Sequence, residues 1–239
     1  MADELWPGGP RFRDETDGFR LGADSVLLAH FAKAARVRKR RVIDLGCGSG
    51  LISILLAWDD PDLLVEGIEI RPRAACLAAE NAKNSGVSDR MSVLEGDLRR
   101  HRELFNAGVY DLTVSNPPFY KLGSGKPPDN EETSAARGEE HCTLADVCAA
   151  ASYLTRWGGS FALAHKPERL VEIFSTLTDA GFEPKRIRFV QHKQTSPPYL
   201  ALIESRRGGK PSLNIEPPLI LTNNDGSDSD EAKEKLRNR

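Results

Sequence analysis

The segment of this chain that most constrains its fold is residues 41–50, which read Arg-Val-Ile-Asp-Leu-Gly-Cys-Gly-Ser-Gly. Its apolar residues Val42 and Ile43 are typical of a buried strand that ends near Asp44. The helix-like run 51–57 follows the last glycine. The three alternating glycines are Gly46, Gly48 and Gly50. Glycine adopts positive φ without strain and lets a ligand lie close to the backbone. The segment therefore predicts a nucleotide-binding corner, with a glycine-rich turn that binds nothing as the alternative.

Strand-like and helix-like segments alternate along most of the chain, which predicts an α/β fold with a parallel sheet and helices on both faces. We expect seven strands, one ending at residue 43 and the others at 63–69, 91–95, 110–115, 160–165, 184–191 and 198–205. Only a short loop with two prolines separates the last two strands, so they are expected to form an antiparallel hairpin. The prediction is a doubly wound, mostly parallel seven-stranded sheet with an antiparallel C-terminal hairpin.

Two acidic residues fall at the ends of predicted strands. Glu69 lies about twenty positions beyond the glycines, where a carboxylate can accept hydrogen bonds from both ribose hydroxyls. Asp97 follows the third strand and could hold an adenine amino group. The alternative for both residues is a surface carboxylate or a helix cap.

A second motif, Asn116-Pro-Pro-Phe119, follows the fourth strand directly. Consecutive prolines cannot continue a sheet, so they fix the chain just past the strand end. Asn116 is thereby presented to the crevice in which open α/β sheets bind ligands. Its side-chain oxygen and the Pro117 carbonyl can accept both hydrogens of an exocyclic amine, which turns the nitrogen lone pair towards a methyl donor. Phe119 offers a flat face on which an extruded base can stack.

Composition adds limits rather than assignments. The 239 residues suffice for one large domain, and 39% hydrophobic and 28% charged residues are ordinary for a globular protein. No apolar stretch is long enough to span a bilayer, and the N-terminus lacks the pattern of a secretion signal. The four cysteines show no C-x-x-C pair, so structural disulfides and a metal site are not expected. We expect a cytoplasmic protein without membrane association.

The net charge of −2 does not by itself indicate a polyanionic partner, but basic residues are clustered. One cluster spans residues 36–41, a second holds Lys185, Arg186 and Arg188 with His192 and Lys193, and a third holds Arg206 and Arg207 with Lys210. Such clusters are either solvated faces or a localised basic face that binds nucleic acid.

The flanking regions have weaker patterns. Residues 1–20 are broken by prolines and glycines and predict an irregular N-terminal arm before a domain at 21–206. Asp24 or Ser25 is a natural N-cap for the helix that follows. Residues 121–142 predict a long polar loop over the crevice. In the extension 207–239, residues 213–221 could form an extended segment, and 222–239 are expected to lack regular structure.

Taken together, Asp44-Leu-Gly-Cys-Gly-Ser-Gly50 and the Asn116 motif resemble the class I S-adenosylmethionine-dependent amino-methyltransferases. The dinucleotide-binding fingerprint fits less well, because it requires glycine in place of Leu51. Residues 17–29 and 217–226 are similar to the opening and the ending of the bacterial valine-tRNA adenine-N6 methyltransferase family. The resemblance covers most of residues 10–226.

This resemblance implies a Rossmann-like fold, S-adenosyl-L-methionine as cofactor, and RNA as partner, with tRNA favoured. It implies that the target base is held by Asn116, Pro117, Pro118 and Phe119. The implied cofactor-binding residues are Arg20, Asp24, Ser25, Asp44, Gly46, Cys47, Gly48, Gly50, Glu69, Ile70, Asp97, Leu98 and Asn116. Among these, Arg20 and the 24–25 turn would close over the methionine end of the cofactor.

The target base is the open part of this interpretation. Many adenine-modifying members carry tyrosine where this chain has Phe119, and phenylalanine is also common among ribosomal-RNA guanine-N2 enzymes. A DNA adenine, a protein glutamine and a non-catalytic donor-binding module are further alternatives. The basic clusters weigh against glutamine, and the intact Asn116 motif weighs against loss of catalysis.

Overall fold

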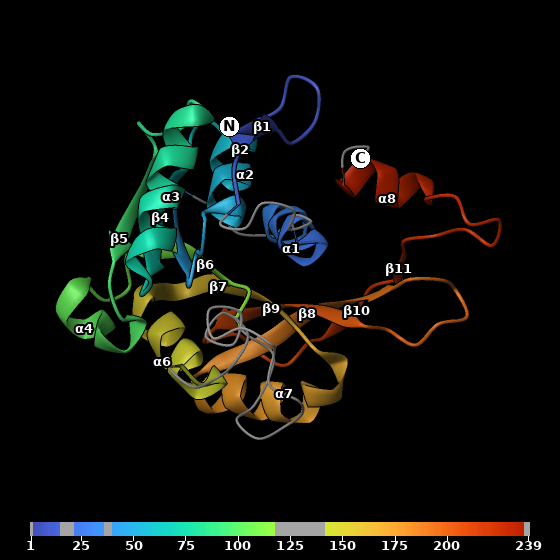
Figure 1. Ribbon diagram of the computed structural model, residues 1–239. Helices are drawn as coiled ribbons and strands as arrows, with labels where there is room; N and C mark the ends of the chain where they lie inside the picture. Colours follow the sequence, from blue (N-terminus) through green and yellow to red (C-terminus); the bar gives the residue numbers. More distant parts are fainter. Residues whose placement is uncertain (1, 15–21, 36–39, 118–141, 237–239) are drawn as a thin grey trace, which may run out of the picture.

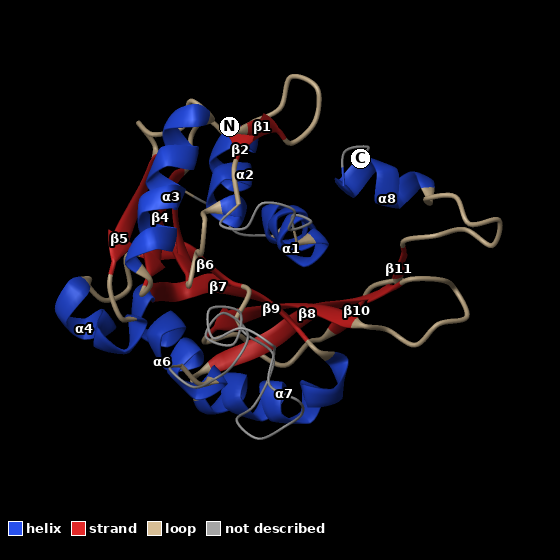
Figure 2. Ribbon diagram, in the orientation of Figure 1, coloured by secondary structure: helices blue, strands red, loops and turns tan. Residues whose placement is uncertain are grey.

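The computed structural model describes residues 2–14, 22–35, 40–117 and 142–236. Its centre is a sheet with helices on both faces (Figures 1 and 2). The long strands are β3 (Arg41–Leu45), β4 (Leu64–Glu69), β5 (Met91–Glu95), β6 (Tyr110–Ser115), β7 (Thr155–His165), β8 (Phe182–Gln191) and β9 (Leu200–Arg207). The helices are α1 (Ala23–Lys33), α2 (Leu51–Asp59), α3 (Pro72–Asn84), α4 (His101–Leu104), α6 (Leu144–Leu154), α7 (Leu170–Asp179) and α8 (Asp230–Leu236), with 3-10 turns η1 (Leu98–Arg100) and η2 (Pro167–Arg169).

The strand order is β10-β8-β9-β7-β6-β3-β4-β5, and β11 also pairs with β8. Neighbouring strands are parallel except where β9 pairs antiparallel with β7 and β8. The predicted mostly parallel sheet of seven strands with a C-terminal hairpin is therefore confirmed. Two further strands of two residues each, β10 (Asn214–Ile215) and β11 (Leu219–Ile220), extend it to nine because they hydrogen-bond to the outer edge of β8.

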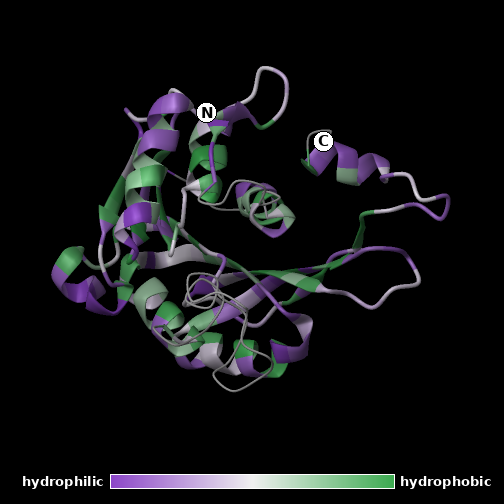
Figure 3. Cartoon of the chain, in the orientation of Figure 1, coloured by the Kyte–Doolittle hydropathy of each residue, from purple (hydrophilic) through white to green (hydrophobic). Residues whose placement is uncertain are grey.

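The core has two halves because successive strand residues face opposite sides of the sheet. Val42 packs with α1 and α2 on one face, and the next residue, Ile43, packs with α6 and α7 on the other. Both faces are covered, which is why the central strands carry buried apolar residues on both sides of the sheet (Figure 3). Within the described ranges, no helix is long and apolar enough to cross a membrane.

The start of helix α1 corrects one expectation. Helix α1 begins at Ala23 after Gly22, and no side chain caps it, so the prediction that Asp24 or Ser25 is the N-cap is wrong. The helix starts early enough to place both residues inside its first turn, where their side chains are available to other partners. Helix α6, in contrast, has a side-chain cap: the Thr143 hydroxyl accepts from the Asp146 amide, and the Asp146 carboxylate accepts from the Thr143 amide.

The N-terminal arm is more regular than predicted. Strands β1 (Asp3–Glu4) and β2 (Arg11–Phe12) form a short antiparallel pair. The arm is fixed to α3, because the Arg13 amide donates to Asn81 Oδ1 at 3.0 Å and Ser85 Oγ donates to the Arg11 carbonyl at 2.8 Å. Phe12 is buried in the core as a result.

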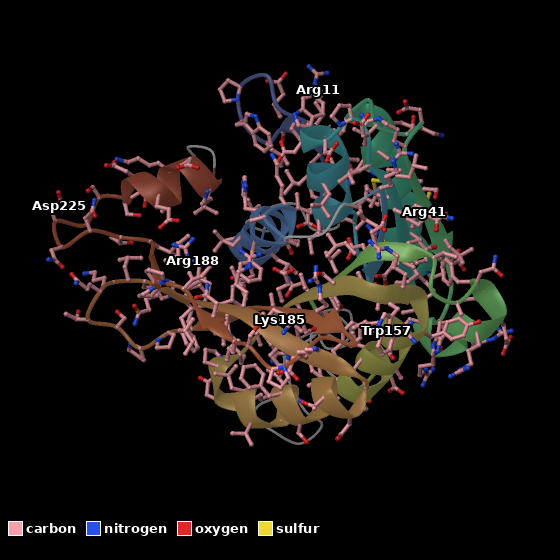
Figure 4. All side chains as sticks on the ribbon, turned by 180° about the vertical axis from the view of Figure 1, so that it is seen from behind. Arg11, Arg41, Trp157, Lys185, Arg188 and Asp225 are labelled. Carbon is pink, nitrogen blue, oxygen red and sulfur yellow. The ribbon has the colours of Figure 1, made fainter. Side chains whose placement is uncertain are left out.

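The C-terminal segment also departs from the prediction. Residues 213–221 do supply extended strands, but the expected lack of structure beyond residue 222 is wrong for α8, which packs against α1. Arg188 on β8 pairs with Glu231 at 2.8 Å, Ala232 is buried, and Leu236 packs against the core, so an ion pair and apolar contacts hold this largely polar helix in place. Figure 4 shows Arg188 beside this segment.

Candidate active site

The two sequence motifs lie at the same edge of the sheet. Strand β3 pairs in parallel with β4 on one side and with β6 on the other, so the carboxyl ends of all three strands meet. The glycine turn follows β3, Glu69 ends β4, and Asn116 follows β6. Ser115 Oγ donates to the Leu45 carbonyl at 2.8 Å, which ties the ends of β6 and β3 together. We call this side of the sheet the carboxyl edge.

The glycine turn leaves room above its backbone. Gly46, Gly48 and Gly50 have φ of 72°, 55° and 89°. This is the left-handed region, which glycine adopts without steric cost. A Cβ at Gly46 would meet nothing within 4 Å, and one at Gly48 only the Arg71 guanidinium at 3.9 Å. A Cβ at Gly50 would instead lie 3.0–3.1 Å from Met91 and Ala78. Gly50 therefore serves close packing, and Gly46 and Gly48 leave open space for a ligand.

Backbone hydrogen bonds fix this turn to β4. The amides of Gly46 and Cys47 donate to the Ile68 carbonyl at 2.9 and 3.1 Å. The Cys47 side chain is buried, with Sγ 2.7 Å from where a Gly67 Cβ would stand. Cys47 thus contributes to the site through its backbone, and its thiol, whose pKa burial raises, is packed against β4.

Glu69 lies at the centre of this arrangement. It is buried and accepts from the Gly48 amide at 2.9 Å and from the Arg71 amide and Nε at 3.0 Å. A carboxylate has about four acceptor positions, so capacity remains for a ligand hydroxyl. The neighbouring Ile70 is 47% exposed, which places an apolar side chain beside the carboxylate.

Asp97 and Leu98 follow β5 at the same edge. The Gly96 amide donates to the Glu69 carbonyl at 2.9 Å, so the residues after β5 lie next to the end of β4. Asp97 caps η1 through the Arg99 amide and pairs with the Arg99 guanidinium at 2.9 Å, which lowers the pKa of the carboxyl. Asp97 thus acts as a helix cap, which was the alternative to adenine binding for this residue. Leu98 is half-buried against the core.

Asp44 is a fully buried carboxylate with one oxygen in use. Oδ2 accepts from Ser53 Oγ at 2.8 Å, and Oδ1 has no hydrogen-bond partner among the described residues. Desolvation raises the pKa of Asp44 to about 7, and the Ser53 hydrogen bond opposes part of this shift. A buried acceptor without a donor is destabilising, so Oδ1 is suited to receive a donor or a cation from a ligand.

Asn116, which follows the neighbouring strand β6, shows the same feature. Its Nδ2 donates to Ser25 Oγ at 3.0 Å, whereas its Oδ1 is buried and has no hydrogen-bond partner in the part of the chain that the structure describes. Ser25 on α1 therefore orients the amide so that its oxygen remains available as an acceptor. Pro117 is buried directly after it.

The residue next to Ser25 faces a different group. Asp24 hydrogen-bonds to Tyr199, and its burial raises the pKa of the carboxyl while Lys166 and His192 act against the shift. Three predicted site residues, Arg20, Pro118 and Phe119, and the loop expected at 121–142 lie outside the described residues, apart from residue 142. Sequence reasoning missed Ser53, Arg71 and Tyr199. Two of these residues could have been found from their positions. Ser53 lies in the first helical turn after the glycines, and Arg71 lies two residues after Glu69.

The basic cluster at 185–188 is engaged within the molecule. Arg186 pairs with Glu204 at 2.9 Å and with Glu216 at 3.2 Å, and its guanidinium lies 3.8 Å from the centre of the Phe31 ring. Arg188 holds α8 through Glu231 as described above. Lys185 donates to the Lys210 carbonyl (Figure 4). These cations attach the C-terminal segment to β8.

Comparison with known proteins agrees with this geometry. Residues 21–127 match the family model of the methyltransferase small domain. That match covers less than half of the 239 residues. The sequence is 39% identical over 158 residues to a tRNA1(Val) (adenine(37)-N6)-methyltransferase of Porphyromonas gingivalis strain W83, which confirms the resemblance drawn from the two motifs. That match covers 64% of this chain and 61% of the relative, so it spans about three fifths of the relative's length.

Solved structures show which fold this chain shares. A predicted O-methyltransferase from Agrobacterium tumefaciens superposes with a TM-score of 0.73 at 20% identity, covering 90% of this chain and 95% of the other. TrmN from Thermus thermophilus superposes with a TM-score of 0.52 at 23% identity, covering 77% of this chain and 48% of the other. The fold is thus that of methyltransferases. Among the described ranges, no group of three or more His, Cys, Asp or Glu side chains is arranged to hold a metal ion.

Proposed function

We propose that this chain is an S-adenosylmethionine-dependent N-methyltransferase that acts on the exocyclic amine of a base in RNA, with adenine N6 in a tRNA as the favoured target. One observation carries the proposal. The buried Oδ1 of Asn116, which has no hydrogen-bond partner among the described residues, lies at the same carboxyl edge as the glycine turn, and Ser25 accepts from its amide NH2 group. An acceptor in this position suits an amine that must lie within reach of a bound donor.

The donor side of the crevice offers groups that fit S-adenosyl-L-methionine. Glu69 would accept from a ribose hydroxyl, and the exposed Ile70 would cover the adenine. The open space above Gly46 and Gly48 would admit the nucleoside next to the backbone. Asp44 Oδ1 would receive the ammonium of the methionine end, which would satisfy the buried acceptor. The bound cofactor supplies an electrophilic methyl group on its sulfonium.

On the acceptor side, Asn116 Oδ1 and the Pro117 carbonyl would accept the two hydrogens of the target amine. These two hydrogen bonds would hold the amine with its lone pair towards the donor. The Ser25 contact would keep the Asn116 amide from turning its own NH2 group to the substrate, which would repel an amine. The residues thus act by orientation, and the proton leaves after the nitrogen has formed its new bond.

The choice of substrate is supported by the relative named for adenine-37 of tRNA1(Val), which is 39% identical over its matched part. A ribosomal-RNA guanine, a DNA adenine and a protein glutamine present the same kind of NH2 group and are the alternatives. A cytoplasmic location belongs to the same proposal, because it follows from the tRNA substrate.

The experiment is methyl transfer from labelled S-adenosyl-L-methionine to total tRNA, ribosomal RNA, DNA and protein, followed by nucleoside and amino-acid analysis. We expect N6-methyladenosine in the tRNA fraction. Asn116→Ala should still bind the donor in calorimetry, because the glycine turn, Asp44 and Glu69 remain, and should lose transfer, because the acceptor for the amine is removed. If label appears only in the ribosomal-RNA, DNA or protein fraction, that fraction contains the substrate and tRNA does not. Full turnover by Asn116→Ala would overturn the assignment of the site.

A further inference from the structure

We propose that the stacked rings of His192 and Tyr199, together with Lys166 and Lys193, form a docking surface for the RNA nucleotide next to the target base. This inference rests on the proposed function and adds the place where the RNA is gripped. We call these four residues the His192 surface.

The topology places this surface at the edge of the sheet that holds the active site. Strand β7 pairs in parallel with β6, with Ser115 opposite Leu163, so β7 ends at the carboxyl edge and is followed there by Lys166. The antiparallel β9 begins at the same edge, because Ala201 pairs with His165. The connection from β8 to β9, which carries the two rings, therefore lies there too.

Helix α1 connects the surface to the catalytic asparagine. Asp24 hydrogen-bonds to Tyr199, and the next residue, Ser25, accepts from the Asn116 amide at 3.0 Å. Asp24 thus contacts the His192 surface, and the next residue, Ser25, contacts Asn116, the amine-binding residue. A nucleotide on the surface and a base at Asn116 would be neighbours along one RNA strand.

The chemistry of the surface fits a nucleotide. The His192 and Tyr199 rings lie 4.4 Å apart at an interplanar angle of 11°, and His192 is exposed. Lys166 Nζ lies 5.7 Å from the centre of the Tyr199 ring and 3.4 Å from its carbonyl. Lys193 is also exposed. An exposed ring that is already stacked offers its outer face to a base, and adjacent ammonium groups suit a phosphate, which is how single-stranded RNA is held without reading its sequence.

The connection that carries His192 is held in shape before any partner binds. The Thr222 amide donates to the His192 carbonyl at 2.8 Å, and Gln191 Nε2 donates to the Ser196 carbonyl at 2.7 Å. The Ser196 amide donates to the Lys193 carbonyl at 3.0 Å. The C-terminal segment, itself anchored by Arg188, thus supports the surface, and a preorganised surface loses less entropy on binding.

The test measures binding of unmodified tRNA by fluorescence anisotropy over a range of salt concentrations. We expect His192→Ala to weaken binding roughly tenfold, the range for loss of one stacked base, with no change in the salt dependence. His192→Phe should restore affinity, because it keeps the ring. Lys166→Ala should reduce the slope of log K against log salt by about 0.7, the value for one phosphate contact of a single strand.

The control removes the same charge elsewhere. Lys210, exposed after the far end of β9, lies beyond the opposite edge of the sheet, so Lys210→Ala should leave RNA affinity and salt slope unchanged. Donor affinity, measured by calorimetry, should be unchanged in His192→Ala. In turnover with tRNA, the loss should appear in KM rather than in kcat.

Wild-type RNA affinity in both His192→Ala and Lys166→Ala, with an active wild-type enzyme, would overturn the docking surface and leave the proposed function standing. Failure of the wild type to methylate any RNA would overturn the proposed function itself. Equal losses in His192→Ala and His192→Phe would show that the imidazole group, and not a stacking ring, supplies the affinity, which also contradicts the proposal.

Discussion

The buried carboxylate of Asp44 predicts that donor binding depends on pH near neutrality. Its pKa is raised to about 7 by desolvation, and Oδ1 has no hydrogen-bond partner among the described residues. The methionine end of the donor carries an ammonium, which binds the ionised carboxylate and not the protonated one. Affinity should therefore rise as pH rises through 7.

The magnitude follows from the ionised fraction. With a pKa of about 7, roughly one Asp44 in eleven is ionised at pH 6 and about three in four at pH 7.5. The dissociation constant should fall about eightfold between these pH values. The upper limit of pH 7.5 keeps the donor's own amino group mostly protonated, since α-amino groups titrate near 7.7–8.0. Binding at pH 6 should release close to one proton.

Calorimetric titration of S-adenosyl-L-methionine at pH 6.0 and 7.5, in buffers of different ionisation enthalpy, measures both quantities. Asp44→Asn should weaken binding and remove the pH dependence, and Ser53→Ala should move the midpoint to higher pH because a hydrogen bond that favours the carboxylate is lost. An affinity that stays constant from pH 6 to 7.5, or wild-type affinity in Asp44→Asn, would refute the reasoning.

The same residue predicts how stability depends on pH. The pKa of Asp44 is raised above its ordinary value of 3.8, so the folded chain binds more protons than the unfolded chain between about pH 4 and 7. Its contribution to the free energy of unfolding is present in full below pH 4 and is lost as pH rises through 7, by an amount on the order of 4 kcal/mol. Asp44→Asn should therefore unfold at a higher temperature than the wild type at pH 8 in the absence of ligand.

Three further variants test separate contacts. Ser25→Ala should lower single-turnover methyl transfer about tenfold or more, because the Asn116 amide loses its fixed orientation, and Ser25→Thr should keep most of the rate. Gly48→Val should abolish donor binding in calorimetry, because its side chain would fill the open space, whereas Gly50→Ala should mainly lower the melting temperature through contact with Met91 and Ala78; unchanged donor affinity in Gly48→Val would count against the turn as the site. Arg188→Ala should speed hydrogen exchange in α8, and unchanged protection there would show that the Glu231 pair does not hold the helix.

The fold could be predicted because its signals are local. The central strands are buried on both faces, so they appear as short runs rich in apolar residues, and Gly50 marks a helix start because its backbone takes a left-handed conformation. The prediction for the N-cap of α1 was wrong because Gly22 takes that position, although it has no side chain to cap the helix. Helix α8 was missed because its stability comes from Arg188, more than forty residues earlier in the chain.

In the candidate site too, local signals could be predicted from the sequence and distant contacts could not. Glu69 and Asn116 could be placed because strand ends of a parallel sheet share one edge. Asp97 was assigned to an adenine amine, and its pairing with Arg99, two residues away, was not anticipated. The role of Ser25 in orienting Asn116 could not be derived, because 91 residues separate the two and no local pattern connects them.

The basic clusters show why sequence alone could not locate an RNA surface. Cations at 185–188 and at 206–210 are more numerous than those around His192, and the sequence favoured neither group on physical grounds. The antiparallel direction of β9 decides between them. Because β9 runs against β7, its final residues, Arg206 and Arg207, lie opposite Ser160 and Phe182, far from the carboxyl edge, and its first residues lie beside His165. The short connection before β9 is thus the part of the hairpin that reaches the active site, and replacing Lys185 with alanine should leave RNA binding unchanged where Lys166→Ala weakens it.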